Sequence, residues 1–90
     1  MSHYHLTEKQ IQIVSTIHKH WLEKEEDIYM DQLLQEIPYT TTKESMQFSL
    51  RALVKKGIVV KRESWAVRRG RARRTYGITV FGKTMLRLEA

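Results

Sequence analysis

Five arginines lie within residues 68–74, and a short apolar stretch flanks them on each side. Residues 65–67 precede the arginines and residues 76–78 follow them, with a further apolar stretch at 58–60. A disordered basic tail would lack such flanks, because it has little apolar surface to bury. The pattern therefore predicts a basic loop held on a β-hairpin, with strands over 58–67 and 73–78 and a turn around Arg69 and Gly70.

The positive charge of the chain is concentrated in the same region. Residues 51–74 hold ten Lys and Arg against one Glu, a formal charge of +9, whereas residues 1–50 carry −4 and residues 75–90 carry +1. Charge of one sign at this density repels itself, so a negatively charged partner is expected. Nucleic acid is the leading candidate, and an acidic membrane surface comes second.

Length and composition limit the chain to few classes of protein. Ninety residues with 41% hydrophobic content are typical of one globular domain. The absence of cysteine excludes disulfides and thiolate chemistry and fits a reducing compartment. No apolar run approaches the roughly twenty residues that a membrane span needs, and the first residues lack the order of a signal peptide. We expect one cytoplasmic domain over residues 1–90, with a flexible lead-in over 1–6.

The first helix is predicted to begin at Thr7. Thr7 and Gln10 have the spacing of a capping box, in which each side chain bonds the backbone N–H of the other residue. The acidic run over 23–27 opposes the helix dipole and should end the helix. Between these limits, residues at helical spacing form an apolar stripe made of Ile11, Val14, Ile17 and Trp21, with His18 and Leu22 beside them.

Four histidines raise the question of a metal site. His3 and His5 alternate near the start of the chain, whereas His18 and His20 are two residues apart in the predicted helix and point away from each other. No cysteine or acidic residue completes a familiar zinc-binding spacing. We therefore expect solvated histidines, no metal site and no cofactor.

A second, short helix is predicted from Met30 or Asp31 to Glu36, after an extended piece at 28–29. Asp31 is the expected cap. Pro38 stops the helix, because the residue before a proline is pushed out of the helical conformation. The buried face of this helix is expected to consist of Leu33, Leu34 and Ile37.

A third helix is predicted over 43–56. Thr41 and Glu44 form a second capping box at its start, and Gly57 terminates it, since glycine adopts a positive φ at little cost. The predicted core positions of this helix are Met46, Leu50, Leu53 and Val54.

The face of the third helix opposite that core is predicted to bind the partner. This face has short polar side chains near the start of the helix and basic side chains near its end. Such a face suits a helix whose first turns enter a DNA major groove. Phe48 is discordant on this face, and it could contact a thymine methyl, pack under a neighbouring helix or belong to a dimer contact. We expect burial within the fold. The residues of this face are Thr41, Glu44, Ser45, Phe48, Arg51, Ala52 and Lys55.

The last predicted element is a helix that Thr79 caps. Its apolar residues are available either to the core or to a second subunit, and Trp21 presents the same choice. A homodimer and a monomer therefore both stay open. The apolar residues concerned are Val80, Met85, Leu86 and Leu88.

The order of these elements resembles that of winged helix-turn-helix regulators. Residues 50–59, LRALVKKGIV, resemble the L-x-x-L-x-x-x-G-[LI]-[VI] passage from recognition helix into wing. Residues 70–82, GRARRTYGITVFG, resemble the G-R-x-x-x-x-Y-x-[LI]-T-x-x-G ending of bacterial regulators of the PadR and MarR groups. The resemblance implies an α+β, mostly helical fold with a three-helix core, a two- or three-stranded wing hairpin and a C-terminal helix. Such regulators carry further long helices for dimerisation, for which 90 residues leave no room.

The resemblance also implies that the protein is a transcription regulator that binds double-stranded DNA. Residues 42–56 would then lie in the major groove, and the wing over 68–74 would meet the minor groove or phosphates. On the hairpin itself, Arg74 and either Lys61 or Arg62 would contact phosphates. The target sequence and any small-molecule effector stay unassigned. The implied DNA-binding residues are Thr41, Thr42, Lys43, Ser45, Arg51 and Lys55 on the helix, and Arg68, Arg69, Arg71, Arg73 and Arg74 on the wing.

Three other classes of function compete with this one. An RNA-binding module, or a winged helix of replication or conjugation machinery, would use the same arginines. A protein-interaction domain would join the acidic end of the first helix to the basic hairpin in self-assembly. An enzyme is disfavoured, because the glycines are scattered at 57, 70, 77 and 82 and no nucleophile motif is present.

Overall fold

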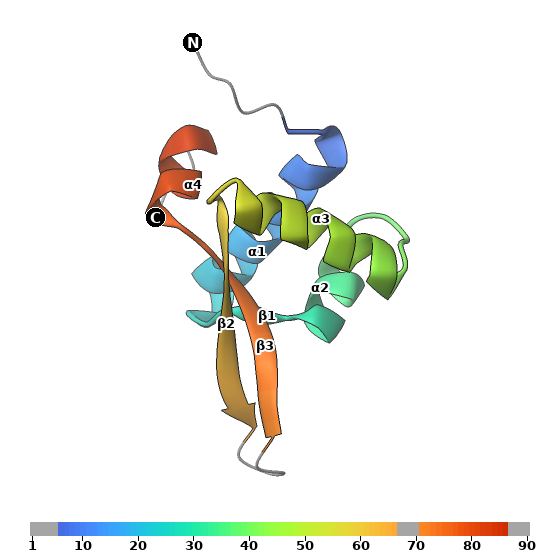
Figure 1. Ribbon diagram of the computed structural model, residues 1–90, viewed down its shortest axis with the longest axis vertical. Coiled ribbons are helices and arrows are strands. Elements are labelled where there is room, and N and C mark those ends of the chain that lie inside the picture. Colours follow the sequence, from blue (N-terminus) through green and yellow to red (C-terminus); the bar gives the residue numbers. More distant parts are fainter. Residues whose placement is uncertain (1–5, 67–70, 87–90) are drawn as a thin grey trace.

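The computed structural model describes the backbone over residues 6–66 and 71–86, and the side chains over 6–63 and 74–86. Helices gather at one end of the molecule, and the two long strands extend from them as a ribbon (Figure 1). The arrangement confirms the predicted α+β class, with a three-helix core, a wing hairpin and a last helix. The elements are α1 (Glu8–Lys24), β1 (Ile28–Tyr29), α2 (Met30–Glu36), α3 (Lys43–Lys55), β2 (Val59–Ala66), β3 (Arg71–Ile78) and α4 (Val80–Leu86).

Some predictions fall on residues outside this description. They include the lead-in with its two histidines and the turn at the wing tip. Leu6, by contrast, is described and packs against the core. None of the described helices is both long and apolar enough to cross a lipid bilayer. The predicted positions outside the described residues are His3, His5, Arg68, Arg69, Gly70 and Leu88.

Local capping fixes the start of α1 as predicted. The Thr7 hydroxyl accepts a hydrogen bond from the Gln10 backbone N–H at 3.1 Å, and Gln10 Oε1 accepts one from the Thr7 N–H at 3.0 Å. The capping box is therefore confirmed. The helix ends at Lys24, inside the acidic run, and Glu25 follows in the left-handed conformation with φ 55°.

The caps predicted for α2 and α3 are wrong in position. α3 begins after Thr42, whose hydroxyl accepts from the Ser45 N–H at 3.1 Å, rather than after Thr41. α2 begins after Tyr29, whose backbone N–H donates to a side-chain oxygen of Gln32 at 2.9 Å, so Asp31 lies within the first turn. At α3, two neighbouring threonines of the same capping ability left the start ambiguous, and Thr42, with extended backbone beside the first turn, takes the role. At α2, Tyr29 is not a residue that capping preferences select, and the bond comes from the Gln32 side chain instead.

Gly57 ends α3 and turns the chain into the hairpin. Its φ is 79°, its N–H bonds the Val54 carbonyl at 2.9 Å, and the Ile58 N–H bonds the Leu53 carbonyl at 3.1 Å. This pair of bonds is the Schellman motif that glycine favours at helix ends. The predicted terminator is confirmed, with the last helical residue at Lys55 rather than at residue 56.

The strands form one antiparallel sheet in the order β1-β3-β2. Val59 pairs with Ile78 at the base of the hairpin, and Ala66 pairs with Arg71 near its tip. β3 therefore begins two residues earlier than the sequence predicts. Ile28 of β1 pairs with Tyr76 of β3, so the wing has the three-stranded form of the two expected forms.

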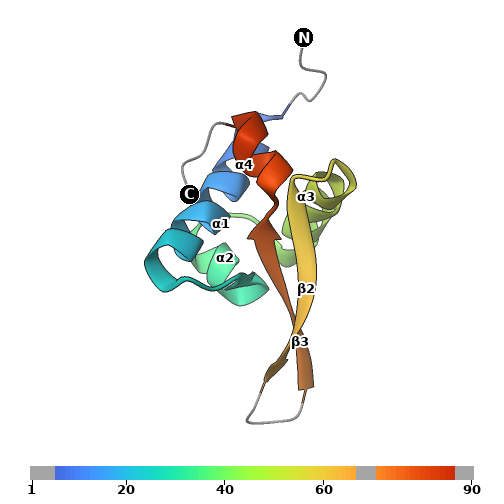
Figure 2. The ribbon, with the colours of Figure 1, turned by 90° about the vertical axis from the view of Figure 1, so that its left-hand side faces the viewer.

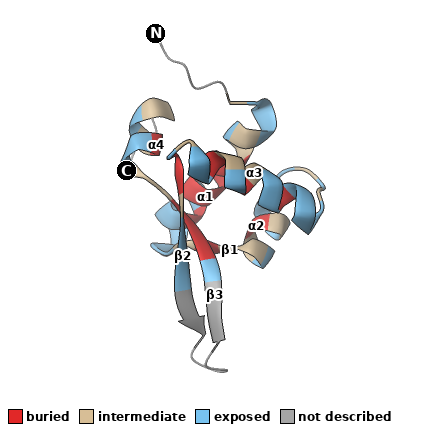
Figure 3. Cartoon of the chain, viewed as in Figure 1, coloured by how far each residue is buried: buried red, intermediate tan, exposed pale blue. Residues whose placement is uncertain are grey.

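One apolar cluster fills the space between the helices and the base of the sheet (Figure 3). The buried face of α1 includes Ile13, which the predicted stripe omits, because contacts with α2 and the sheet select the face. The cluster consists of Ile13, Val14, Ile17, Ile28, Leu33, Ile37, Met46, Leu50, Leu53, Ile58, Val59 and Tyr76. Residues predicted for the core or the apolar stripe but exposed in the structure are Ile11, Trp21, Leu22 and Val54. Val80, for which the core and a second subunit stayed open, is exposed as well.

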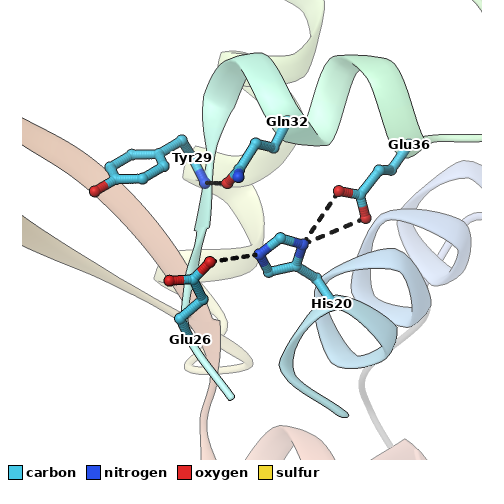
Figure 4. A network of polar contacts seen from close by, with 5 residues as sticks. All are labelled: His20, Glu26, Tyr29, Gln32 and Glu36. Atoms are coloured by element: carbon cyan, nitrogen blue, oxygen red, sulfur yellow. Dashed lines mark hydrogen bonds and ion pairs between the residues drawn. The ribbon is translucent and has the colours of Figure 1, made fainter. Parts of the chain in front are cut away.

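The expectation of solvated histidines is wrong for His18 and His20, which are both buried. His20 Nδ1 lies 3.1 Å from Glu36 Oε2, and its Nε2 lies 3.8 Å from Glu26 Oε1, which is ion-pair rather than hydrogen-bond distance (Figure 4). His20 thus holds the end of α1 against α2. His18 lies toward the sheet, where its ring nitrogens have no hydrogen-bond partner among the described residues. The described side chains include no group of three or more ligands suited to a metal ion.

α4 is seated on the turn that follows α3. The Thr79 hydroxyl accepts from the Gly82 N–H at 2.9 Å, as the predicted cap requires, and the Thr79 N–H donates to the Ile58 carbonyl at 3.0 Å. A Cβ on Gly82 would lie 2.5 Å from that carbonyl oxygen, so glycine is needed for this close approach. Met85 and Leu86 then pack against the core.

Candidate nucleic-acid interface

The β2–β3 hairpin has two faces, because successive residues of a strand point to opposite sides. Lys61 pairs with Tyr76 and shares its face with Arg74, whereas Arg62 pairs with Thr75 on the other face. Figure 2 shows α3 on one side of the hairpin and α1 on the other. Lys61 and Arg62, two neighbouring basic residues of β2, are therefore directed to different surroundings.

A hollow of about 160 Å³ lies between α3 and the Lys61 face of the hairpin. Three exposed cations line it: Arg51 from α3, Lys61 from β2 and Arg74 from β3. No carboxylate is among the described residues that line it. We call this hollow the α3–wing groove; its other lining residues are Gln47, Leu50, Val54 and Tyr76.

Tyr76 leaves the charge of the α3–wing groove unchanged near neutral pH. Burial raises the pKa of the Tyr76 phenol, and the Arg74 guanidinium opposes this rise. The phenol is therefore neutral at physiological pH, because its ordinary pKa already lies near 10. The net charge of the groove comes from its three cations.

On the opposite face, Arg62 is neutralised within the fold. Its guanidinium pairs with the carboxylate of Asp27, a side chain that is only 15% exposed. Gly77 on the neighbouring strand leaves room for this pair, because a Cβ there would lie 2.5 Å from Asp27 Oδ1 and 3.1 Å from Arg62 Nη1. The sequence left Lys61 and Arg62 as alternative phosphate contacts. The structure leaves Lys61 accessible in the groove and engages Arg62 in an ion pair.

Most of the recognition residues predicted on α3 lie on its surface. Thr41 is half-buried, and the Thr42 hydroxyl is engaged as the cap of the helix. Arg51 is the member of this group that also lines the α3–wing groove. The exposed members are Thr42, Lys43, Ser45, Arg51 and Lys55.

The expectation that Phe48 is buried is wrong. Its side chain is 73% exposed on α3. The core reaches only the arc of the helix around Met46, Leu50 and Leu53, and Phe48 lies on the opposite side. The packed arc of α3 is thus narrower than the sequence suggested.

The predicted wing residues divide into three groups. Arg68 and Arg69 lie outside the described residues. Arg71 and Arg73 belong to β3, where they pair with Ala66 and Ser64, and their side chains are outside the description. Arg74 is exposed and lines the groove. The structure therefore brings Arg74 together with Arg51, and both with Lys61.

Lys61 is the groove residue that the predicted binding set omitted. The alternation of side chains along a strand identifies Lys61, because every second residue points to the same face. Once Lys61 is placed opposite Tyr76, the face that carries Arg74 also carries Lys61 and excludes Arg62. The sequence alone did not give this register, because the alternation of β2 is interrupted over residues 61–64.

The fold is similar to one solved by crystallography. A PadR family transcription regulator from hypervirulent Clostridium difficile R20291 superposes with a TM-score of 0.69 and 21% sequence identity, over 91% of this chain and 82% of that chain. No family model matches the sequence. No curated protein matches it either. At this level of identity the likeness is one of fold, and the chain has the winged helix-turn-helix fold that its element order predicted.

Proposed function

We propose that this protein is a transcription regulator that binds double-stranded DNA inside the cell. The first turns of α3 enter the major groove, and the wing follows the neighbouring phosphates or the minor groove. The reading residues just before α3 and along it are Thr41, Thr42, Lys43, Ser45, Arg51 and Lys55, and the wing contributes Arg68, Arg69, Arg71, Arg73 and Arg74, joined by Lys61.

The observation that carries this proposal is the convergence of three cations on one groove. Arg51, Lys61 and Arg74 come from three different elements and share one hollow without a carboxylate among its described lining residues. A phosphate is a ligand that such a set of cations suits, since guanidinium and ammonium groups are the main phosphate contacts in protein–DNA complexes. On the other face, Arg62 is neutralised by Asp27. Basic side chains of the hairpin are thus not all left without an acidic partner, which makes the three cations of the groove distinctive.

The capped start of α3 adds a second line of support. The Thr42 cap satisfies one backbone N–H, and the surrounding side chains of Lys43 and Ser45 are exposed. An exposed helix start with short polar side chains suits contacts to phosphates and base edges. The solved protein with a similar fold is itself described as a transcription regulator.

The test is a salt series of fluorescence anisotropy with random duplex DNA. If about six cations neutralise phosphates, log affinity should fall against log salt with a slope of about −5. The variant with Arg51, Lys61 and Arg74 all changed to Ala should bind more weakly, with the slope reduced in magnitude by about 2.7. Arg62→Ala is the matched control and should leave the slope unchanged.

The outcomes separate the competing functions. Absence of duplex binding at low salt would overturn the proposal. Tighter binding of structured RNA than of duplex DNA in a competition would assign the groove to RNA instead. Strong self-association without nucleic acid would assign the charged surfaces to assembly.

A further inference from the structure

Phe48 places an aromatic ring on the proposed DNA-binding face of α3. Contacts to phosphates require cations and hydrogen-bond donors, so they do not account for this ring. It is the most exposed aromatic side chain among those that the structure describes, at 73%. Leaving a ring of this size in water gives up roughly 1.5–3 kcal/mol of burial energy. The side of α3 that faces the core is formed by Met46, Leu50 and Leu53, and Phe48 does not belong to it.

The position of Phe48 on α3 is central to the proposed reading face. At 100° per residue it lies nearly opposite Leu50, and Ala52 and Lys55 follow it one and two turns later on the same side. Arg51 borders this side and also lines the α3–wing groove. The ring therefore lies on the part of α3 that the wing leaves uncovered, with the exposed Arg51 and Lys55 after it and the exposed Glu44 one turn before it on the same side.

Charge complementarity favours nucleic acid over an apolar partner surface at this position. Arg51 and Lys55 beside the ring are exposed and would have to lose water in an apolar contact. Against DNA the same cations face phosphates, while the ring reaches the floor of the major groove. The apolar feature there is the C5-methyl group of thymine, which phenylalanine contacts in known complexes.

We infer that Phe48 is a specificity-determining residue that contacts a thymine methyl in the major groove. This inference rests on the proposed function and names the base that the site must contain. It also gives a physical reason for DNA over RNA, because uracil lacks the methyl and the A-form major groove does not admit side chains.

The experiment uses duplexes recovered by selection from a random library with the full chain. Each thymine of the recovered site is replaced in turn by deoxyuridine, which removes only the methyl group. One substitution should weaken wild-type binding roughly fourfold, the change expected for burying one methyl group. The Phe48→Ala variant should bind the thymine duplex more weakly than wild type and should bind both duplexes equally. Val80→Ala removes another exposed apolar side chain and should behave as wild type.

The outcomes distinguish this inference from the function on which it rests. If selection recovers no duplex, the proposed function fails and this inference fails with it. If duplexes are recovered and every deoxyuridine effect is the same in wild type and Phe48→Ala, only the assignment of Phe48 is overturned. A change of oligomeric state in Phe48→Ala by sedimentation, with no deoxyuridine effect, would assign the ring to a second copy of the chain and also overturn it. Circular dichroism confirms that each variant is folded.

Discussion

The two faces of the hairpin differ in how they hold two neighbouring basic residues, Lys61 and Arg62. On the α1 side, Arg62 is bound to Asp27 over a glycine that leaves room for the pair. On the α3 side, Lys61 shares a groove with two further cations, and Glu63, which pairs with Arg74 on the same face of the hairpin, is not among the described residues that line this groove. On the first face Arg62 is neutralised by Asp27, whereas the described residues that line the groove on the second face leave three cations without a carboxylate. Substitutions on the α1 face should therefore change stability, and those on the α3 face should change binding.

The largest expected effect comes from reversing the charge of each neighbour. Lys61→Glu places a carboxylate among Arg51 and Arg74 and should weaken duplex DNA binding about a hundredfold, or about 2.7 kcal/mol. Its free energy of unfolding should change by no more than about 0.5 kcal/mol, as is usual for surface sites. Arg62→Glu should instead lower stability by about 1 kcal/mol, because Asp27 loses its partner and faces a like charge. Anisotropy and urea unfolding measure the two quantities, and equal effects on binding would remove the distinction between the faces.

The next effect tests the packing of the α1 face. Gly77→Ala should lower the free energy of unfolding by about 1–2 kcal/mol, because the new Cβ meets the Asp27 carboxylate. In an Asp27→Ala background the same substitution should be neutral or stabilising by up to about 1 kcal/mol, since the closest contact of the new Cβ is gone, the released Arg62 guanidinium can move away, and alanine restricts the unfolded chain. Urea unfolding of the four proteins gives the coupling energy. Additive effects would show that the glycine serves another purpose.

A smaller effect concerns a residue on the α3 side that is structural. Thr42→Ala removes the cap of α3 and should cost about 1 kcal/mol of stability. Thr41→Ala, one residue earlier, should change stability by no more than about 0.5 kcal/mol. Thermal or urea unfolding compares the two variants. The reverse order would restore the cap position that the sequence predicted.

The smallest expected effect is that of Arg62→Ala. The ion pair with Asp27 is half-exposed on the arginine side, so its loss should cost no more than about 1 kcal/mol of stability. The salt slope of DNA binding should stay within error of wild type, because Arg62 does not face the α3–wing groove. A slope reduced by about 0.9 would show that Arg62 contacts a phosphate after all.

Much of the fold could be predicted because its signals are local. The Thr7 capping box, the Gly57 terminator and the Thr79 cap each depend on a few consecutive residues, and all three are confirmed. The fate of Phe48 could not be predicted in this way. Its exposure depends on how far the neighbouring elements extend around α3, which no local pattern states.

The candidate site was predicted in composition more than in arrangement. The sequence located the charge in the hairpin and on the third helix, and Arg51 and Arg74 do meet across the groove. It did not choose between Lys61 and Arg62, and it treated two buried histidines as solvated. His20 is held by Glu36, sixteen residues away, and Arg62 by Asp27, thirty-five residues away. Such partners are known only when distant segments are placed together.

By itself the sequence determined the element order, the start of α1, the glycine that terminates α3, the cap of α4 and the concentration of positive charge, because these follow from backbone preferences and composition. The tertiary structure decided which basic side chains are paired with a carboxylate and which remain accessible. Strand register directs Lys61 to one side and Arg62 to the other, and β1 brings Asp27 to the second side. Register is a property of paired strands, and a shift of one residue would exchange the two faces. The difference between an arginine that is paired within the fold and a lysine that stays accessible in the groove therefore arises only when the sheet forms.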